Sequence, residues 1–250
     1  MSDFSSWSLP FVIAHRGAPL LATENTLDAL MKAKEQGASA VECDIQLTRD
    51  QMPVILHDAT LDRTTCLSGL LSKISLKKLK ALEAGVPTLQ EWLQTAAQLK
   101  LKLNLEIKAR TKKQSELLAG IVLDYIKKYW PDNLSTPFIS SSNLYCLSQV
   151  AKRNKKLLTG LIIEKKISDK TCDELLKKNI ISLHQPYRLL NAKYIAKLHA
   201  KGLRVLAYTV NDLKCLKKLI AMKIDGVFTD DHTLYGAKTL QHHQHFFCAR

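Results

Sequence analysis

Paired cysteines are missing from this sequence. Its six cysteines never form a C-x-x-C pair, and their spacing suits neither a zinc site nor a disulfide framework. They stand at Cys43, Cys66, Cys146, Cys172, Cys215 and Cys248. Scattered thiols of this kind are typical of a reducing compartment, and they exclude the class of small domains held together by disulfides.

Long apolar runs and targeting signals are missing too. Charged residues interrupt every hydrophobic run well short of the ~18 residues that a membrane span needs. The first ten residues contain neither a basic n-region nor an apolar h-region, so they do not read as a signal peptide. These absences favour a cytoplasmic protein without a transmembrane segment.

The chain also lacks a linker rich in Pro, Gly or Ser, and no G-x-G-x-x-G follows the first expected strand. The missing linker argues against a domain boundary, and the missing glycine motif argues against a dinucleotide-binding sheet. With 46% hydrophobic and 24% charged residues, the composition is that of a globular protein with a large core. We therefore predict a single domain over residues 1–250.

The net charge of +14 is concentrated in the second half of the chain. Residues 151–223 carry 18 Lys and Arg against 5 Asp and Glu. Such a field attracts anions: phosphate esters, anionic lipid headgroups or nucleic acid. The lysines are spread over several helical segments without aromatic residues between them, which favours an ordinary solvated surface. We expect no nucleic-acid partner, leave open a transient contact with a membrane surface, and find nothing that selects an oligomeric state.

Strand-like apolar runs alternate with amphipathic helical patterns along almost the whole chain. About eight strand–helix units in series predict a parallel sheet. Eight units in ~250 residues suit a closed barrel better than an open sheet, so we predict an α/β fold, the (β/α)8 TIM barrel. The expected strands are 11–14, 40–45, 53–57, 101–107, 137–140, 157–163, 180–183, 204–209 and 225–229, and the expected helices are 24–36, 76–82, 88–99, 115–129, 143–151, 170–178, 191–201 and 212–222.

Two acidic residues share one face of the second expected strand. Side chains two apart on a strand point the same way, so Glu42 and Asp44 lie together while Val41, Cys43 and Ile45 point to the other face. Neighbouring carboxylates on a buried face repel each other and are costly to desolvate. A divalent cation removes both problems, and oxygen ligands suit Mg²⁺ or Ca²⁺. The plainer alternative is a solvated edge strand with two surface acids.

A third acid and a lysine follow the same rule on the strand at 101–107. Asn104, Glu106 and Lys108 share one face of it. In a barrel of this type, polar residues at the carboxyl ends of the strands form the active site. We expect Glu106 to complete the metal site and Lys108, closer to the strand's carboxyl end, to face a phosphate.

Two histidines, His15 and His57, each follow an apolar run. Imidazoles that titrate near neutral pH suit general acid and general base roles. Arg16 and Gly17 follow His15 directly, which makes a compact anion site with room for close backbone approach. We predict His15 and His57 as the acid/base pair and Arg16 as part of the anion site; the alternative is structural histidines beside a basic surface loop.

The remaining histidines do not join this pattern. His184 and His232 follow later strands, and their positions allow them at most a supporting role behind the ligands of the site. His199 lies in a helical pattern. The last three, His242, His243 and His245, belong to a tail over 241–250 that reads as a frayed end rather than a metal site.

The order of short motifs resembles that of the glycerophosphodiester phosphodiesterase family, in its small bacterial form. The resemblance covers nearly the whole chain, and its most specific part lies in the first 110 residues. The matching motifs are His15-Arg16-Gly17, Glu24-Asn25-Thr26-Leu27, Glu42-Cys43-Asp44, Leu47-Thr48-Arg49-Asp50, His57-Asp58, Leu61-Asp62-Arg63-Thr64-Thr65 with Gly69, Glu106-Ile107-Lys108, Tyr208-Thr209-Val210-Asn211 and Asp225-Gly226-Val227-Phe228-Thr229-Asp230.

The resemblance implies a TIM barrel of the phospholipase-C-like phosphodiesterase type. It also implies hydrolysis of glycerophosphodiesters to glycerol 3-phosphate and an alcohol, a step of glycerophospholipid and glycerol metabolism. The roles that it implies for matching residues are one bound Mg²⁺ or Ca²⁺ at Glu42, Asp44 and Glu106, acid and base at His15 and His57, and phosphate binding at Arg16 and Lys108.

Two positions depart from the family pattern. Thr23 stands where Pro is usual, and Thr can serve as a helix cap. Tyr208 stands where Trp is frequent, and we expect it to line the pocket for the alcohol.

Two alternatives stay open: lysophospholipase-D-like hydrolysis of lysophospholipids, with an apolar entry over 67–82, and a barrel that binds phosphate without catalysis. The residues select neither the metal nor the alcohol, nor do they decide between attack by water and by the glycerol 2-hydroxyl.

Overall fold

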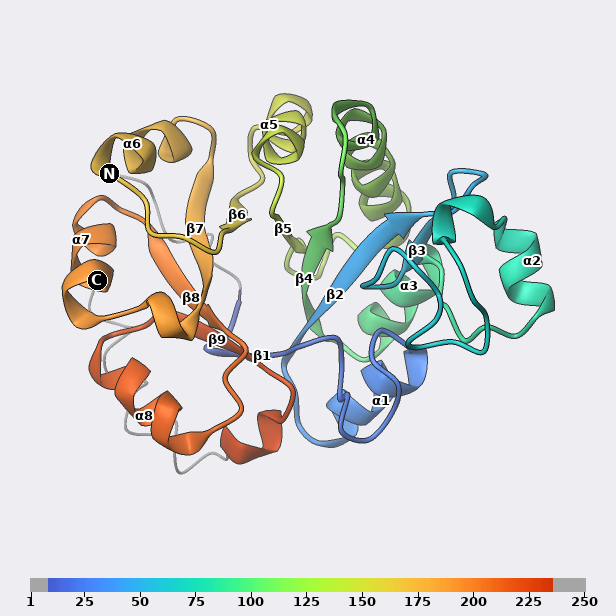
Figure 1. Cartoon of the computed structure of the whole chain (residues 1–250), viewed down its shortest axis with the longest axis horizontal. Helices are drawn as coiled ribbons and strands as arrows, with labels where there is room; N and C mark the ends of the chain where they lie inside the picture. The colour runs from blue at the N-terminus through green and yellow to red at the C-terminus, as the bar shows by residue number, and fades with distance from the viewer. Residues whose placement is uncertain (1–8, 236–250) are drawn as a thin grey trace.

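A closed barrel of parallel strands forms the centre of the molecule (Figure 1). The computed structural model describes residues 9–235. The sheet order is β1-β9-β8-β7-β6-β5-β4-β2-β3, and a further β1–β2 pairing closes the ring. The eight parallel strands are β1 Val12–Ala14, β2 Ala40–Leu47, β4 Lys102–Ile107, β5 Phe138–Ser141, β6 Thr159–Ile162, β7 Ile180–Pro186, β8 Arg204–Tyr208 and β9 Gly226–Thr229. The predicted (β/α)8 barrel is confirmed.

Within residues 9–235, seven helices surround the barrel (Figure 1); six directly follow a barrel strand, and α3 follows β2 after β3 and an insert. Each begins after a Ser, Thr, Asn or Asp whose side chain accepts a hydrogen bond from a backbone N–H in the first turn, which satisfies a donor that the helix leaves unpaired. No helix in the described part of the chain is long and apolar enough to cross a bilayer. The helices are α1 Leu27–Glu35, α3 Leu89–Gln98, α4 Lys112–Tyr129, α5 Leu144–Arg153, α6 Asp169–Leu176, α7 Ala192–Ala200 and α8 Leu213–Ala221.

The strand predicted at 53–57 is not part of a strand–helix unit. β3, Pro53–Ile55, runs antiparallel to β2, with Ile45 opposite Ile55. β2 extends past its pairing with β4, and β3 turns back along it toward the carboxyl ends of the barrel strands. This return brings the chain down to the level of Asp44, whose carbonyl accepts a hydrogen bond from the Leu56 N–H at 2.9 Å. His57 therefore reaches the barrel mouth from a hairpin, not from a neighbouring barrel strand.

An insert over residues 56–88 separates β3 from α3. It contains a short 3-10 helix, η2 Leu71–Lys73, and α2 Leu76–Ala81, which projects beyond the ring of helices on the right of Figure 1. The predicted helix at 76–82 is thus confirmed. The insert has an apolar cluster of its own, formed by Val54, Leu56, Leu61, Leu71, Leu79, Ala84 and Val86, so it folds against the barrel as a small packed unit.

Side chains on β2 alternate as expected. Val41, Cys43 and Ile45 belong to the large apolar cluster between barrel and helices, while Glu42 and Asp44 are buried on the opposite face. A second apolar cluster fills the barrel interior and includes residues from β1, β5, β8 and β9: Ile13, Phe138, Leu206 and Phe228. The barrel interior is therefore filled with apolar side chains, and the polar residues Glu42 and Asp44 lie next to this filled interior.

His184 lies inside this packed interior, because β7 continues to Pro186 instead of ending at Leu183. Its ring lies 5.0 Å from that of Phe228 and 6.0 Å from that of Phe138, and its Nε2 lies 3.1 Å from Ser182 Oγ. Burial lowers the pKa of His184 to about 3, so the ring is neutral. The expectation that His184 supports the site's ligands is wrong: its partners are core residues.

His232 also lies elsewhere than expected. Its Nε2 is 3.1 Å from the carbonyl oxygen of Ala33 in α1, so it joins the last described segment, η4 His232–Tyr235, to that helix. Burial lowers its pKa. The histidines of the predicted frayed tail, and Cys248, lie outside the described residues.

Candidate active site at the barrel mouth

Three carboxylates from two adjacent strands meet at the mouth of the barrel. β2 carries Glu42 and Asp44, and β4 carries Glu106, which is paired in register with Asp44. Each offers an oxygen, and these oxygens lie within 4.8 Å of one another. Glu42 and Asp44 are buried, and Glu106 is largely so. The strand register thus places the three predicted metal ligands together.

The three acids do not share their charge equally. Burial raises the pKa of Glu42 well above its usual value, and the neighbouring acids raise it further. Burial and the charge of Asp44 raise the pKa of Glu106 to about 7. Asp44 is also subject to burial, but Lys108, Arg16, His57 and a hydrogen bond from Asn25 together lower its pKa to about 2. Negative charge is therefore in excess here, and a bound cation would relieve it.

Two cations lie against this cluster. Lys108 Nζ is 3.1 Å from Asp44 Oδ1 and 3.4 Å from Glu106 Oε1. Arg16 Nε is 3.2 Å from Asp44 Oδ2, and its backbone N–H donates to Glu42 Oε2 at 3.1 Å. Both predicted phosphate ligands are therefore at the site, where they face the carboxylates.

The backbone at Arg16 is shaped for this approach. Arg16 and Asn25 both have left-handed φ values, 58° and 60°, and the Asn25 N–H donates to the Arg16 carbonyl at 2.9 Å. Gly17, at φ 94°, packs so closely on α1 that a Cβ would lie 2.7 Å from the carbonyl carbon of Ala29. Only glycine fits there, so packing against α1 requires Gly17, and the close approach of its backbone to an anion stays a prediction.

His15 stands on one side of the mouth. Its Nδ1 is 2.7 Å from Asp230 Oδ1, and Asp230 follows β9 directly. The other oxygen of Asp230 accepts a hydrogen bond from Asn211 Nδ2 at 2.7 Å, and Asn211 Oδ1 accepts from the Asp230 N–H. The carboxylate is thereby held in place, and it holds the imidazole in turn.

His57 has the same arrangement on the other side. Its Nδ1 is 2.7 Å from Asp58 Oδ1, and Arg63 Nε donates to Asp58 Oδ2 at 2.6 Å. Arg63 also donates to both oxygens of Glu24, at 2.8 and 2.7 Å, and Glu24 Oε1 accepts from Arg16 at 2.9 Å. A continuous chain of charged groups therefore links His57 to the predicted phosphate ligand.

The sequence does not predict the partners of the two histidines. Asp58 and Asp230 belong to motifs quoted for the family resemblance, as do Glu24, Arg63 and Asn211, but no role is predicted for any of them. A local signal existed for Asp58, which follows His57 directly. Asp230 pairs with His15 across 215 positions of sequence, and only the closure of the barrel brings them together.

Burial lowers the pKa of His57, while the carboxylates of Asp44 and Asp58 act in the opposite direction. The neutral form is thus favoured, and with Nδ1 engaged by Asp58 its Nε2 is the nitrogen left to exchange a proton with a substrate.

Tyr208, the predicted pocket residue, ends β8 half-buried. Burial and the charges of Glu164 and Glu106 raise its pKa to about 12, so its hydroxyl stays neutral.

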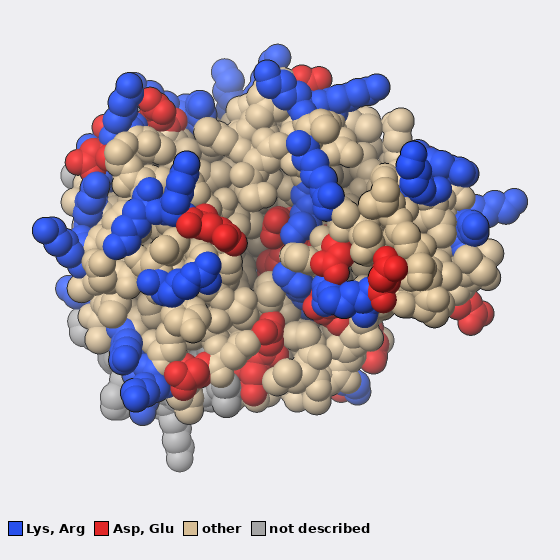
Figure 2. Space-filling model, viewed as in Figure 1, with Lys and Arg blue, Asp and Glu red and all other residues tan. Residues whose placement is uncertain are grey.

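Figure 2 shows a hollow in the middle of the barrel face, with acidic side chains inside it and Lys and Arg on several sides. The donor set in the hollow fits a hard divalent cation, because it consists of clustered carboxylate oxygens with an excess of negative charge. The residues present therefore match the predicted metal site in chemistry.

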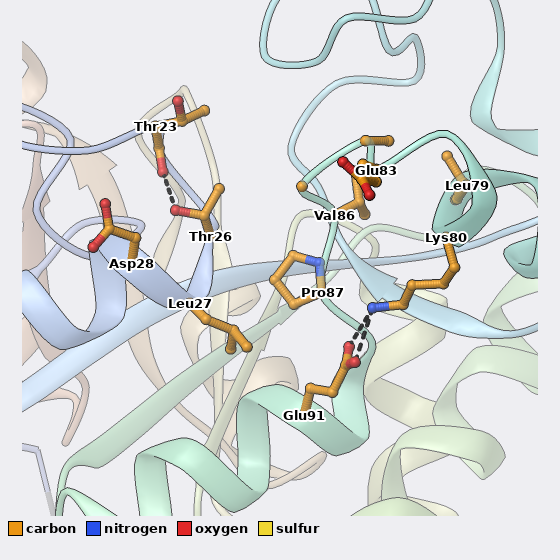
Figure 3. Close-up of a pocket in the computed structure, with 12 residues that line it drawn as sticks. Thr23, Thr26, Leu27, Asp28, Leu79, Lys80, Glu83, Val86, Pro87 and Glu91 are labelled. Carbon is orange, nitrogen blue, oxygen red and sulfur yellow. Dashed lines mark hydrogen bonds and ion pairs between the residues drawn. The ribbon is translucent and has the colours of Figure 1, made fainter.

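A groove between α1, α2 and α3 lies outside this site (Figure 3). It encloses about 550 Å³ and is lined by residues such as Thr26, Leu27 and Pro87. Lys80 Nζ bridges both oxygens of Glu91 at 2.8 and 2.7 Å along one wall. None of the predicted site residues lines it, so the groove lies between the insert and α1 and is not part of the candidate site.

Comparison with known proteins identifies the family and the relatives that this chain resembles. Residues 15–234 match the Glycerophosphoryl diester phosphodiesterase family. A glycerophosphodiester phosphodiesterase of Caldanaerobacter subterraneus is 32% identical, over 88% of this chain and 93% of that protein. The structure of an Oleispira antarctica phosphodiesterase in complex with the product sn-glycerol-3-phosphate has a TM-score of 0.85 at 32% identity, covering 94% of this chain and 98% of that one. A glycerophosphodiester phosphodiesterase of Thermotoga maritima has a TM-score of 0.76 at 29% identity, covering 91% and 97%.

Proposed function

The chain belongs to the glycerophosphoryl diester phosphodiesterase family and is by that membership a phosphoric diester hydrolase; on this premise we propose that it hydrolyses glycerophosphodiesters to glycerol 3-phosphate and an alcohol, using His15 and His57 as its acid/base pair. The product named in the Oleispira antarctica structure supports glycerol 3-phosphate as the common product.

One observation carries the proposal. Two histidines, each with Nδ1 at 2.7 Å from a carboxylate oxygen, stand at the mouth that holds three clustered acids and two cations. Hydrolysis of a phosphodiester needs a base for the nucleophile, an acid for the departing alkoxide and positive charge near the phosphoryl oxygens. This mouth offers all three.

Glu42, Asp44 and Glu106 would hold the metal, and their oxygen ligands suit Mg²⁺ or Ca²⁺. When bound, the cation supplies a Lewis acid that offsets charge on the phosphoryl oxygens. Arg16 and Lys108 add fixed positive charge there. A phosphodiester anion would compete with the carboxylates for these two cations, which are ion-paired with Asp44 in its absence.

The histidines exchange the protons. The depressed pKa of His57, caused first by burial, suits it to take the proton from the nucleophile, and His15 then protonates the leaving oxygen. Asp58 and Asp230 keep the two rings oriented. Tyr208 closes the mouth on the β8 side, where we place the alcohol portion of the substrate.

We place the protein in the cytoplasm. Its five described cysteines are free thiols, at Cys43, Cys66, Cys146, Cys172 and Cys215, which agrees with a reducing compartment.

Release of glycerol 3-phosphate from glycerophosphocholine and glycerophosphoethanolamine tests the proposal. We expect release with Mg²⁺ or Ca²⁺, loss in EDTA, and a drop of roughly a hundredfold or more in kcat for His15→Ala, the scale of a lost general acid. His199→Ala is the matched control, because His199 also lies 2.7 Å from an aspartate, Asp225, but in α7 on the outside of the barrel. Loss of phosphodiesterase activity in both variants, or none in either, would contradict the assigned site.

Lysophosphatidylcholine serves as a second substrate in the same assay. Its hydrolysis at a comparable rate would favour the lysophospholipase-D-like alternative. Absence of turnover on every substrate with either metal, together with retained phosphate binding, would leave a non-catalytic barrel.

A further inference from the structure

Large apolar side chains exposed on this protein gather at one end of the barrel. In the part of the chain that the structure describes, eight such side chains are exposed. Five of them come shortly after a parallel barrel strand, in the segments that surround the active-site mouth. They are Leu20 and Leu21 after β1, Leu144 after β5, Tyr187 after β7 and Leu213 after β8.

The exposure of these side chains is substantial. Leu20 is 67% exposed, Leu21 52% and Tyr187 45%. A sixth, Leu70, belongs to the insert and lines a small cavity together with Lys108 and Arg110, so it too lies near the mouth. Scattered exposed leucines are ordinary on a protein surface, but a ring of them around one opening indicates contact with an apolar phase.

Basic side chains occupy the segments between them. The segment after β4 carries Arg110, Lys112 and Lys113, and the segment after β6 carries Lys165 and Lys166; all five are exposed. From β4 to β7, segments with exposed basic residues therefore alternate with segments that carry an exposed apolar residue, and the segment after β8 is again apolar. Figure 2 shows Lys and Arg on several sides of the hollow.

Acidic residues on this rim are fewer. Glu164 and Asp212 are exposed there, and Asp212 uses its carboxylate to cap α8. The rim thus keeps an excess of positive charge around an acidic centre. Part of the positive charge of residues 151–223 accordingly belongs to the mouth, and not to the outer helices alone.

From this arrangement we infer that the rim of the barrel mouth is a docking surface for an anionic lipid–water interface, against which the open active site rests. Basic side chains attract anionic headgroups, while leucine and tyrosine side chains enter the boundary between headgroups and acyl chains. Neither the basic nor the apolar side chains bind strongly alone, because a few exposed leucines bury little area and a few lysines are screened by salt. Basic and apolar side chains together, on one face, hold the protein at the lipid surface.

Nucleic acid is the other polyanion that this charge would attract, but it gives no use to the exposed leucines. Single-stranded nucleic acid is bound by basic grooves with aromatic stacking platforms. Tyr187 is the single exposed aromatic among the apolar rim residues named above. The lipid interface therefore accounts for both kinds of side chain.

Co-sedimentation of the full chain with vesicles tests the inference. We expect binding to vesicles of phosphatidylcholine mixed with phosphatidylglycerol, weaker binding to phosphatidylcholine alone, and a decline with rising salt. The double variant Lys165→Gln/Lys166→Gln should weaken binding roughly fivefold for each lysine removed. Leu20→Ser/Leu21→Ser should weaken it as well, and its effect should persist at high salt.

Matched controls come from the rest of the surface. Lys177→Gln/Lys178→Gln removes an exposed pair beyond the end of α6, away from the mouth, and Met31→Ser and Leu82→Ser remove exposed apolar side chains outside the segments that directly follow the parallel strands. Met31 lies within α1, beyond the segment that joins β1 to that helix, and Leu82 ends α2; all these variants should bind vesicles as the parent does. All changes are at exposed positions, and a thermal melt confirms that each variant folds.

Three outcomes would overturn the inference. They are no binding to anionic vesicles at low salt, equal losses in the control and rim pairs, and binding that depends on the lysines but not on the leucines and is matched by a single-stranded oligonucleotide. The readout is binding, not turnover, so its failure leaves the proposed phosphodiesterase activity untouched, and failure of that activity leaves the docking surface standing.

Discussion

A single buried histidine, His184, makes the stability of the barrel depend on pH. His184 lies between Phe138 and Phe228, and there is space for it only because Gly160 lacks a Cβ, which would lie 2.5 Å from His184 Nε2. The ring is shut off from water, and burial lowers its pKa to about 3. The interior thus contains a base that cannot be protonated without opening the barrel.

The free energy of unfolding should therefore decrease as the pH is lowered, because of this residue. The unfolded chain binds a proton at His184 below the usual pKa of 6.5, whereas the native state stays neutral down to about 3. Protonation consequently favours unfolding as the pH drops through that window, by about 2 kcal/mol between pH 7 and pH 5. Urea unfolding at the two pH values should show that the parent loses about 2 kcal/mol more than His184→Gln, because the other titrating groups are common to both; equal pH slopes would show that the ring is already accessible in the native state.

At the scale of elements, the insert is tied to the barrel by one arginine. Arg63 donates to Asp58, the partner of His57, and to Glu24 on the segment between β1 and α1. Asp58 has its pKa lowered, first by the hydrogen bond from Arg63. Arg63 touches no group that we assign to chemistry, so it is a positioning residue that acts through Asp58 and Glu24.

We expect Arg63→Gln to lower kcat roughly tenfold or more with a smaller effect on KM, because outer partners of a catalytic group act on its orientation. The pH profile of kcat should move as well, since Asp58 would hold His57 less firmly. Arg63→Lys should recover part of the loss. The control is Lys80→Gln, which removes another ion pair of the insert, with Glu91. A matching effect of that control, or an unchanged pH profile in Arg63→Gln, would reduce Arg63 to a structural link.

Most elements were predictable because each depends on a local pattern. The alternation of Glu42 and Asp44 with apolar neighbours fixed a strand and its faces, and the runs at 101–107 and 204–209 match β4 and β8 closely. The direction of β3 was not predictable, since three apolar residues look alike in a parallel or an antiparallel strand. The end of β7 was missed because polar residues inside a strand resemble the start of a loop.

At the scale of the whole molecule, the site depends on closure of the barrel. Seven of the predicted site residues come from β1, β2, β4 and the hairpin after β2, and Tyr208 comes from the opposite wall. Motif order predicted these residues, but it could not give the pairs His15–Asp230 and Arg63–Glu24, because those depend on how distant segments meet. The rim of exposed leucines likewise had no signature in sequence.

Metal binding should stabilise the entire fold, because the three acids repel one another in its absence. A cation at a hundred times its Kd adds about 2.7 kcal/mol to the free energy of unfolding, or roughly 5–10 °C in Tm for a chain of this size. Thermal melts with Mg²⁺, with Ca²⁺ and with EDTA measure the shift. Glu42→Gln should abolish most of it and should itself melt no lower than the parent in EDTA, because it removes one of the repelling charges; an undiminished shift in Glu42→Gln would locate the metal elsewhere.

The insert leaves the barrel and returns to it at nearly the same point. The Ile55 N–H donates to the Pro87 carbonyl at 2.9 Å, and Val54 forms a bridge with Thr88. Because its two ends adjoin, the segment can lengthen or shorten without displacing a barrel strand. In evolutionary terms it is a cassette: the acidic cluster, Arg16 and Lys108 stay on the barrel, while His57, one of the two histidines we propose for acid/base catalysis, travels with an exchangeable piece of chain. We therefore expect that exchange of this cassette alone would change the surroundings of His57 and leave the barrel strands in place.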